Sequence, residues 1–308
     1  MLRNLQDMTR AERTVNLIAV LLPFVAFIAA VVLLWNSIVG VTDLVAFGVM
    51  YLIAGFGVTV GFHRLLTHRA FQTKKPLEYG FAIAGSMSVQ GPVIDWVADH
   101  RKHHAHTDVE GDPHSPHVAF SDGWIGAAKG LFHAHMGWLF NEHGQAQRRK
   151  YAADLVEDRG MRVINRRFQW WVGAGLLMPF VIGLVLTGSL TGGLTALLWG
   201  GPVRIFLQHH VTWSINSVCH FFGRRRFDVE DHSTNVLWLA IPSLGEAWHH
   251  NHHAFPRSAR HGLRWWEVDL SAVLISFLEK VGLAWNVTRI APERQAQKLA
   301  TNKPAASS

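Results

Sequence analysis

Half of the twenty histidines lie in three short clusters, and this concentration of imidazoles is the part of the sequence best suited to chemistry. The clusters read HRLLTH from His63 to His68, HRKHHAHTD from His100 to Asp108, and HHNHH from His249 to His253. Imidazole is the commonest metal ligand in proteins, and three clusters offer more nitrogens than one ion can coordinate. The sequence therefore predicts a polynuclear metal centre.

Two of the clusters have a spacing that gathers their histidines on one face of a helix, because positions i, i+3 and i+4 are neighbours there. The histidines with this spacing are His100, His103 and His104 in one cluster and His249, His252 and His253 in the other. His106 and His250 point elsewhere on such helices, so we leave them out of the predicted site.

The first cluster needs a different local structure. His63 and His68 are five residues apart, which is about 140° around a regular helix. They can converge only where the helix ends or unwinds. A further candidate pair, Asn216 and His220, has the i, i+4 spacing of one helical face. The predicted set is therefore nine histidines and one asparagine.

The ligand types narrow the choice of metal without deciding it. Neutral imidazole suits iron, copper, zinc and nickel. Structural zinc takes four ligands and usually cysteine, whereas Cys219 is the only cysteine in the chain. Nine imidazoles divide naturally between two ions with four or five ligands each. A pair of redox-active irons fits best, with manganese or zinc as the alternatives.

The composition places this centre at a membrane. The chain is 49% hydrophobic and only 17% charged, below the usual share of charge in a soluble domain. Four apolar runs, at residues 14–35, 44–62, 168–187 and 190–212, approach the roughly 20 residues that a helix needs to cross a bilayer. We expect an all-α integral membrane protein with four transmembrane helices in two hairpins. Residues 1–290 form one membrane domain in this interpretation, and the polar residues 291–308 form a disordered tail.

The distribution of basic residues predicts the orientation. The connections at residues 36–43 and 187–189 contain no Lys or Arg, whereas basic residues gather before, between and after the hairpins. The positive-inside rule then places the termini and the metal site on the cytoplasmic side, in a helical cap. A pI near 9.9 can also indicate nucleic-acid binding, but a basic patch of that kind does not require four apolar spans. We expect membrane lipid, and no nucleic acid, as a partner.

A fifth uncharged run, Tyr79–Ile94, lies between the first two clusters. If this run crossed the membrane, His63 and His100 would face opposite compartments and could not share a metal. It should therefore lie flat, dip in and return, or pack inside the protein, where it would form a wall of a substrate tunnel.

The motifs HRLLTH, HRKHH and HHNHHAFP, with NSVCH before the last, resemble the histidine boxes of membrane-bound fatty acyl desaturases. The nearest likeness is to the stearoyl-CoA-desaturase-like, delta-9 branch, from about Val58 to Pro256. The resemblance implies two iron ions per chain. One would be held by His63, His68, His100, His104 and His252, and the other by His103, His220, His249 and His253, with Asn216 reaching it through water.

The resemblance also implies a reaction, the O2-dependent insertion of a cis double bond at the delta-9 position of a long saturated acyl chain. An unactivated methylene has no acidic proton, so the cofactor must supply the oxidant. The kink of the acyl tunnel would lie near Gln90, Trp96 and Thr212. The tunnel would close between the first two spans, near Tyr51. For Gln90, Trp96 and Thr212, ordinary core and helix packing is the competing interpretation.

Electrons must come from another protein, because the chain has no cysteine set for an iron–sulfur cluster, no flavin-type glycine fingerprint and no fused haem domain. We expect a separate ferredoxin-, flavoprotein- or cytochrome-type carrier. Ligand histidines usually donate their other N–H to a carboxylate. The residues close enough in sequence to serve are Asp99, Asp108, Asp112 and Glu246.

The acyl carrier is where the sequence departs from its animal relatives. The resemblance leads us to expect an Arg–Lys pair after the GWL stretch to grip the CoA phosphates, but Asn141 and Glu142 stand there. Arg148, Arg149 and Lys150 follow closely and could take over. We expect acyl-CoA as the favoured substrate, with a chain bound to a carrier protein or a phospholipid as the alternatives.

Two other functions are compatible with parts of the pattern. A di-iron membrane hydroxylase of alkyl chains or carotenoids could use similar histidine boxes and end in an alcohol. A non-enzymatic metal or haem transporter would need polar residues along several spans, whereas the first three spans carry no charged residue and the histidine clusters lie outside all four.

Overall fold

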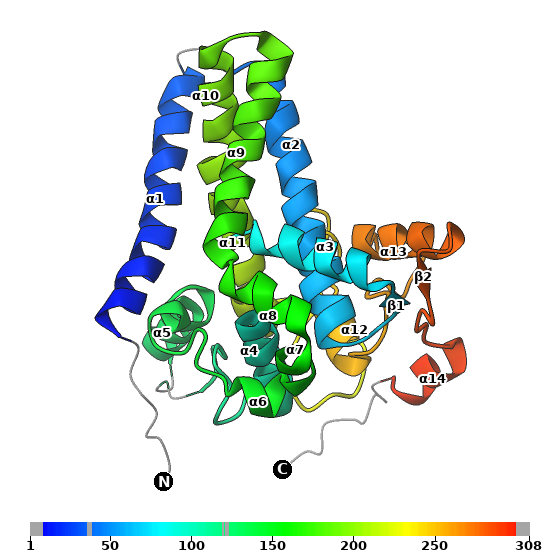
Figure 1. Cartoon of the computed structure of the whole chain (residues 1–308). Coiled ribbons are helices and arrows are strands. Elements are labelled where there is room, and N and C mark those ends of the chain that lie inside the picture. Colours follow the sequence, from blue (N-terminus) through cyan, green and yellow to red (C-terminus); the bar gives the residue numbers. More distant parts are fainter. Residues whose placement is uncertain (1–8, 36–38, 119, 121–122, 300–308) are drawn as a thin grey trace.

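The computed structural model describes residues 9–35, 39–118, 120 and 123–299. A column of long helices stands on a broader base of short helices and loops (Figure 1). In the described part, the strands are β1 (Gln72–Thr73) and β2 (Ala284–Trp285), which pair antiparallel. The fold is otherwise helical, as the sequence predicts.

Four helical segments are long and apolar enough to cross a membrane, which confirms the predicted number. The first is α1 (Arg10–Trp35) and the third is α9 (Phe168–Thr187). The second begins as α2 (Val41–Phe56) and continues as the π-helix η1 (Gly57–Thr67). The fourth runs through α10 (Leu190–Leu198), the π-helix η3 (Trp199–Val203), α11 (Arg204–Ser217) and η4 (Val218–His220). The second and fourth segments extend past the ends expected at residues 62 and 212.

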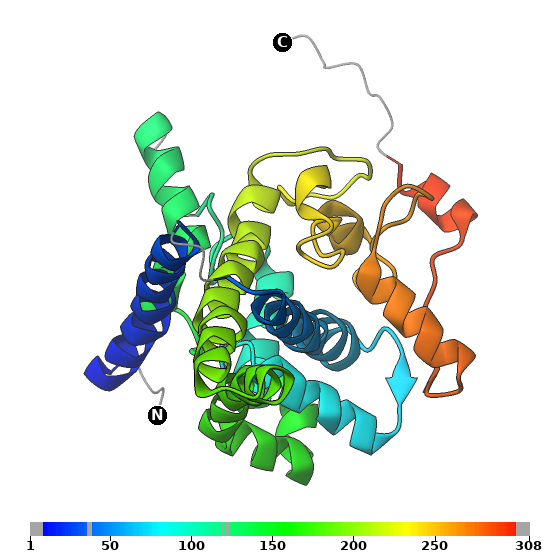
Figure 2. The same cartoon turned by 90° about the horizontal axis from the view of Figure 1, so that it is seen from above.

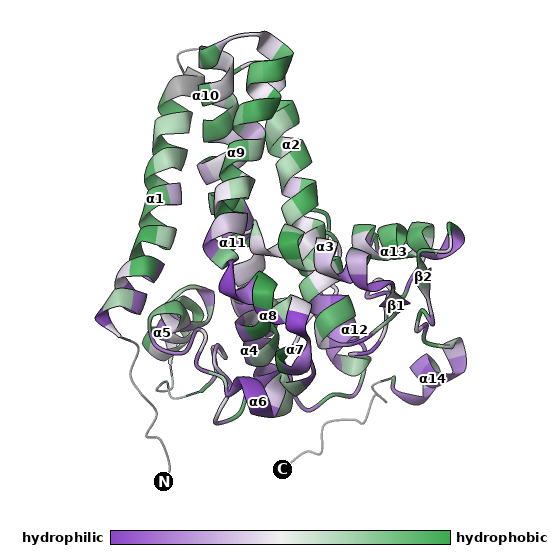
Figure 3. Cartoon of the chain, in the orientation of Figure 1, coloured by the Kyte–Doolittle hydropathy of each residue, from purple (hydrophilic) through white to green (hydrophobic). Residues whose placement is uncertain are grey.

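The column is apolar along its length, and the hydrophilic residues gather in the base (Figure 3). Many of its large side chains are exposed, including Val25 at 60% and Val185 at 74%. Exposed apolar surface on this scale marks contact with lipid in a protein of this composition. The lower ends of the second and fourth segments are buried in the base, where they lead to the histidine clusters.

The helices of the column differ in how closely they pack against their neighbours in the sequence. α9 and α10 are antiparallel neighbours, joined at Gly188, which has a left-handed backbone (φ 65°). They approach closely at Gly183, where a Cβ would lie 2.3 Å from the carbonyl oxygen of Gly192. α1 packs mainly on η3 and α11 and stands apart from α2 in both views (Figures 1 and 2). The expected first hairpin is therefore not a closely packed pair, because the fourth segment provides the surface for α1.

The uncharged run at residues 79–94 does not form a span. It includes most of α3 (Lys75–Ser86), a turn, and the start of α4 (Val93–His106). α3 packs across η1 at paired glycines, since a Cβ on Gly57 would lie 2.1 Å from the backbone nitrogen of Gly85. The run thus packs inside the protein, and α4 carries the second histidine cluster back beside the first.

The remaining helices form the base around one main hydrophobic cluster. They are α5 (Trp124–His135), η2 (Gly137–Phe140), α6 (Arg148–Tyr151), α7 (Ala153–Glu157), α8 (Arg159–Arg166), η5 (Leu237–Leu239), α12 (His249–Ala254), α13 (Leu270–Lys280) and α14 (Pro292–Gln297). The cluster joins Phe62 of η1, Val97 of α4, Met161 of α8 and Ile275 of α13. It holds the segments that carry the first two histidine clusters against the C-terminal helices.

The tail differs from the expectation of disorder. Residues 292–297 form α14, and Lys298 donates a hydrogen bond of 2.8 Å to the carbonyl oxygen of Ala254. Leu299 forms a β-bridge with Phe227. These contacts order the chain through residue 299, and residues 300–308 lie outside the described residues.

Candidate metal centre and adjoining cavities

The nine predicted histidines converge in two neighbouring groups at the foot of the column. In each group the nitrogen atoms lie within 4.8 Å of one another. The first group contains His63, His68, His100, His104 and His252, and the second contains His103, His220, His249 and His253. His106 and His250, which the spacing left out, belong to neither group. The groups are therefore the two sets that the resemblance implies.

The π-helix η1 explains how the first cluster converges. Its i to i+5 hydrogen bonding places residues five apart above one another, and the backbone N–H of His68 donates to the carbonyl oxygen of His63 at 3.1 Å. The two rings consequently lie 4.8 Å apart between centroids. The unwinding predicted from the spacing of these residues is thus present in the structure.

Ring nitrogens face one another within the groups. In the first group, the Nε2 of His252 lies 3.1 Å from that of His63 and 3.0 Å from that of His104. In the second group, the Nε2 atoms of His220 and His249 are 2.9 Å apart. Several helices contribute to each group, so its geometry depends on how η1, α4, η4 and α12 pack together.

Carboxylates hold the opposite ring nitrogen of four of these histidines. Asp112 binds His103, Asp108 binds His220 and Asp231 binds His253, each through Nδ1 at 2.9 Å. Glu246 contacts Nδ1 of His63 in the same manner. A carboxylate at Nδ1 keeps the proton there and leaves a lone pair on Nε2, which is the usual arrangement around protein-bound metals. Three of these carboxylates were among the sequence candidates, and Asp231 was not.

The fourth carboxylate candidate has another role. Asp99 accepts hydrogen bonds from the backbone N–H groups of Gly144 and Ala146, at 2.6 and 3.2 Å. Burial raises the pKa of Asp99 to about 6. It therefore holds the loop after η2 in place instead of orienting a ring of the metal groups.

The electrostatics of the groups favour a bound cation. Burial, together with repulsion from neighbouring imidazoles, lowers the pKa of His104, His252 and His253 well below the ordinary value, so these rings are neutral. Burial alone would raise the pKa of Asp112, but the adjacent His103 holds it below its usual range. The Nε2 atoms of His68, His103 and His253 are buried without a hydrogen-bond partner in the described part of the chain. Converging neutral imidazoles of this kind fit transition-metal ions.

A buried ion network lies behind the first group, and sequence reasoning missed it. The guanidinium of Arg64, fully buried, donates to Glu246 at 3.0 Å and to Asp269, with its nearest carboxylate oxygen at 2.9 Å. It also contacts Nδ1 of His261 at 3.2 Å. Since Glu246 binds His63 as well, this network links the first histidine cluster to the segment after α12. Only the HRLLTH motif itself, with a charged residue beside His63, could have drawn attention to it.

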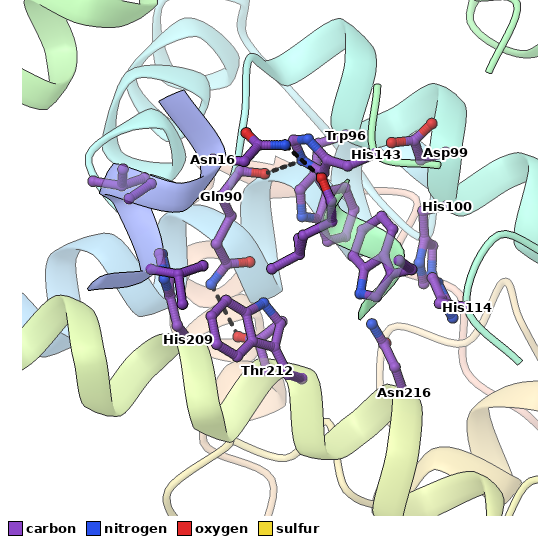
Figure 4. Close-up of a pocket in the computed structure, with 16 residues that line it drawn as sticks. Asn16, Gln90, Trp96, Asp99, His100, His114, His143, His209, Thr212 and Asn216 are labelled. Atoms are coloured by element: carbon purple, nitrogen blue, oxygen red, sulfur yellow. Dashed lines mark hydrogen bonds between the residues drawn. The ribbon is translucent and has the colours of Figure 1, made fainter. Parts of the chain in front are cut away.

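Two cavities adjoin the histidine groups and meet at a shared set of residues. The proximal cavity lies beside α1 and η2, between Asn16, Leu139 and His143 (Figure 4). The distal cavity runs along α2 to Tyr51 and Pro242. The residues that line both are Gln90, Trp96, His100, Thr212 and Asn216. The junction therefore lies against the metal groups.

The predicted tunnel residues occupy these cavities. The side-chain amide of Gln90 donates to the hydroxyl of Thr212 at 2.9 Å, at the junction. The indole of Trp96 stacks on His100, with ring centroids 5.0 Å apart. Tyr51 lines the distal cavity, and its hydroxyl donates to the carbonyl oxygen of Pro242 at 2.6 Å. Asn216 lines the junction beside His100 and His249.

The predicted basic contacts lie elsewhere. Arg148, Arg149 and Lys150 of α6 are exposed, and they line neither cavity. Arg148 pairs with Asp95 on α4, and Glu142 lies 3.6 Å from Lys102. Among the described residues, the proximal cavity has no Lys or Arg in its lining.

These features define a helical protein with four membrane-length helices and a candidate two-metal histidine centre beside two adjoining cavities. Comparison with known proteins identifies the class: the chain belongs to the fatty acid desaturase family, whose model matches residues 42–289. The resemblance noted from the histidine boxes is thereby confirmed, and the enzyme is an oxidoreductase of the desaturase kind.

Several characterised relatives share about two fifths of the residues. The Hex-5-enoyl-(acyl-carrier protein) acetylenase of Moorena producens (strain JHB) is 43% identical, over 86% of this chain and 83% of that protein. The sn-1 stearoyl-lipid 9-desaturase of Anabaena variabilis is 40% identical, over 82% of this chain and 85% of that protein. The Delta-9 acyl-lipid desaturase 1 of Arabidopsis thaliana is 42% identical, over 82% and 77%.

Proposed function

We propose that the protein inserts a cis double bond at the delta-9 position of a long saturated acyl chain, using two iron ions, O2 and electrons from a separate carrier. The observation that carries this proposal is the convergence of nine histidines, in groups of five and four, on the junction of an apolar tunnel. Family membership supports a desaturase over the hydroxylase and the transporter. Two irons would supply the oxidising power that removal of hydrogen from an unactivated methylene requires.

The histidines and their carboxylates would hold the ions. The first group offers five imidazoles and the second offers four, and Asn216 would complete the second through water. Asp108, Asp112, Asp231 and Glu246 keep the Nδ1 protons in place and so direct each Nε2 towards the metal positions. Substitution of such supporting groups typically lowers metal affinity or activity about 10–100-fold.

The tunnel residues would orient the substrate. A chain entering the proximal cavity passes Trp213 and Trp138, bends where Gln90 and Thr212 are bonded, and continues towards Tyr51. The bend presents one short stretch of methylenes to His63, His100 and His249, which line the distal cavity. The apolar walls exclude water from that stretch. Positioning of this kind restricts reaction to particular carbons.

We infer that the acyl chain is carried by a membrane lipid. The sequence by itself favoured CoA as the carrier. Several observations support the lipid. In the described part of the chain, no Lys or Arg lines the proximal cavity. Arg148 already forms an ion pair with Asp95. Asn16, Ala19 and Val20 of the first span line the same cavity, so it adjoins the bilayer. Two of the relatives are named for acyl-lipid substrates.

The orientation and the electron donor complete the proposal. The basic loops support a cytoplasmic location for the termini and the metal site. The donor is a separate ferredoxin-, flavoprotein- or cytochrome-type carrier from that compartment. Turnover by the isolated protein with O2 and NADPH alone would contradict a separate donor.

One assay tests substrate and carrier together. The purified protein, with a reducing system, is given the same stearoyl chain on CoA, on acyl carrier protein and in phosphatidylglycerol. We expect an alkene from the lipid form and little from the other two. A product confined to CoA, abolished by neutralising Arg148, Arg149 and Lys150, would restore the acyl-CoA assignment. An alcohol as the product from all three forms would overturn desaturation itself.

A further inference from the structure

An open groove on the base is separate from the tunnel. It has a volume of about 650 Å³ and lies beyond the end of the fourth span, beside Val218 and Phe222. Among the described residues, it shares none of its lining with the proximal or distal cavity. Its walls come from three segments: the loop after η4, the start of the 237–248 loop, and the turn at Arg264. The proposed reaction makes no use of it.

One side of this groove is strongly basic. Arg224, Arg225, Arg226 and Arg264 line it, together with a single carboxylate, Glu267. Its Oε2 accepts from the side chain of Asn251 at 2.9 Å and from two backbone N–H groups, which hold it in place. One carboxylate faces four guanidinium groups, so the lining of the groove carries an excess of positive charge.

Arg226 is the arginine of the groove whose side-chain donors are least satisfied by the protein. Its Nε and Nη1 are buried and have no hydrogen-bond partner in the part of the chain that the structure describes. Burial and the nearby Arg264 lower the pKa of Arg226. Arg225, by contrast, donates to the carbonyl oxygens of Ser233 and Val229, at 2.8 and 2.6 Å, and lies 3.7 Å from the carboxylate of Asp231. Buried donors without an acceptor are costly, and an anion in the groove would remove this cost.

The other side of the groove is apolar and belongs to a loop that contacts the second membrane-length segment. Leu237 and Trp238 line it with exposed fractions of 64% and 68%. The loop that follows them is bound to the second span, where Pro242 accepts the hydrogen bond from Tyr51. Large apolar side chains exposed beside such a segment contact lipid instead of water, and tryptophan is enriched at membrane–water interfaces.

We propose that the groove binds the headgroup of an anionic membrane phospholipid, with the arginines around its phosphate and Leu237 and Trp238 against its upper acyl chains. The planar guanidinium matches phosphate in geometry as well as charge. An acidic protein would meet the arginines, but it would leave the apolar wall exposed to water. The site does not depend on the desaturase reaction, because its residues lie outside the tunnel and the histidine groups.

Native mass spectrometry of the full chain in detergent, titrated with phosphatidylglycerol or phosphatidylcholine, tests the proposal. The wild type should prefer phosphatidylglycerol. Neutralising two arginines, in R226Q/R264Q, should weaken phosphatidylglycerol binding about thirty-fold and leave phosphatidylcholine unchanged. The single variant R264Q, which changes an exposed residue, should fold normally and weaken binding about five-fold. The matched control R294Q removes an exposed charge on α14, away from the groove, and should bind like the wild type.

Three results would overturn the proposal. The first is unchanged phosphatidylglycerol affinity in both arginine variants. The second is displacement of the lipid by an equal concentration of inorganic phosphate, which would make the groove a site for the free anion. The third is that the arginine variants lose binding to an acidic electron carrier but keep binding to the lipid. Desaturation by the same preparations is measured in parallel. Because lipid binding is measured separately, a failure of the reaction would not change the conclusion about the groove.

Discussion

The side-chain amide of Gln90 donates a 2.9 Å hydrogen bond to the hydroxyl of Thr212, and this bond lies where the proximal and distal cavities meet. It joins the turn before α4 to the middle of α11, across 122 residues of sequence. The bond therefore connects the segment that carries the second histidine cluster to the segment that ends at His220.

Breaking this contact should relax the position of the double bond. Thr212→Val keeps the volume and removes the acceptor, which costs about 1 kcal/mol, or roughly five-fold in rate. We expect slower turnover and a mixture of positional isomers, measured by mass spectrometry of derivatised products. Thr191→Val, an exposed position on α10, serves as the control. A single unchanged isomer from Thr212→Val would show that the bend is set elsewhere.

Metal content should follow the two groups separately. The wild type should contain two irons per chain, and His220→Ala should lose about half, because it removes one of only four imidazoles in the second group. His104→Ala should abolish activity while circular dichroism still reports a helical fold. His106→Ala, adjacent in sequence but outside both groups, should keep both ions. Elemental analysis that finds a single zinc, unaffected by changing His220, would refute the two-iron assignment.

The far end of the distal cavity should set the preferred chain length. Gly55 lines this cavity, and a Cβ there would lie 2.7 Å from a methyl carbon of Leu244. Gly55→Leu should therefore shift the preference towards shorter chains, and Tyr51→Ala towards longer ones. Tyr51→Phe keeps the ring and should preserve the wild-type preference. An unchanged product profile in both size variants, measured with a ladder of chain lengths, would place the tunnel end elsewhere.

Loss of Arg64 should destabilise the protein strongly. Arg64→Met leaves two buried carboxylates, Glu246 and Asp269, without their cation. Breaking a buried pair in this way costs about 3–5 kcal/mol. The exposed Arg69, which pairs with Asp154 at the surface, offers a control, because Arg69→Gln should cost less than about 1 kcal/mol. Denaturant unfolding in detergent compares the two, and equal losses would argue against the buried network.

Asp154 should contribute an acid-sensitive part of the stability. Burial opposes its ionisation, but hydrogen bonds from Arg101 and Arg69 hold its pKa at about 2, below its ordinary 3.8. A depressed carboxyl pKa stabilises the folded state above pH 3.8, and that contribution disappears as the pH falls towards 2. Asp154→Asn should thus lower the unfolding temperature at pH 7 and converge with the wild type near pH 2. A constant difference between pH 7 and pH 2 would contradict this role.

The local features of the site were predictable because they follow from helical periodicity. His100, His103 and His104 share a helix face through their spacing, and that face is present in α4. The five-residue step from His63 to His68 required an unwound helix, and η1 has the π-helical hydrogen bonding that satisfies it. Hydrophobic run length likewise predicted four membrane-length helices, since a bilayer demands a minimum span.

Other features depended on contacts between distant segments, for which the sequence carries no spacing signal. Asp231 supports His253 from a loop 22 residues earlier, and Arg64 meets Asp269 across 205 residues. The packing of α1 against the fourth span and the ordering of residues 291–299 also follow from surfaces that exist only after folding. The arginine groove combines three separate segments in the same way.

The sequence by itself determined which side chains could form a metal centre and that this centre lies at the ends of membrane-length helices. Periodicity and hydrophobic length are properties of each segment alone, so they can be read before folding. Spacing alone did not divide the ligands, although the resemblance of the histidine boxes implied the division. The tertiary structure brings it about by placing the neighbours His103 and His104 in different groups. That division depends on which imidazoles of η1, η4 and α12 face each side of α4, and therefore on the packing of segments far apart in the chain.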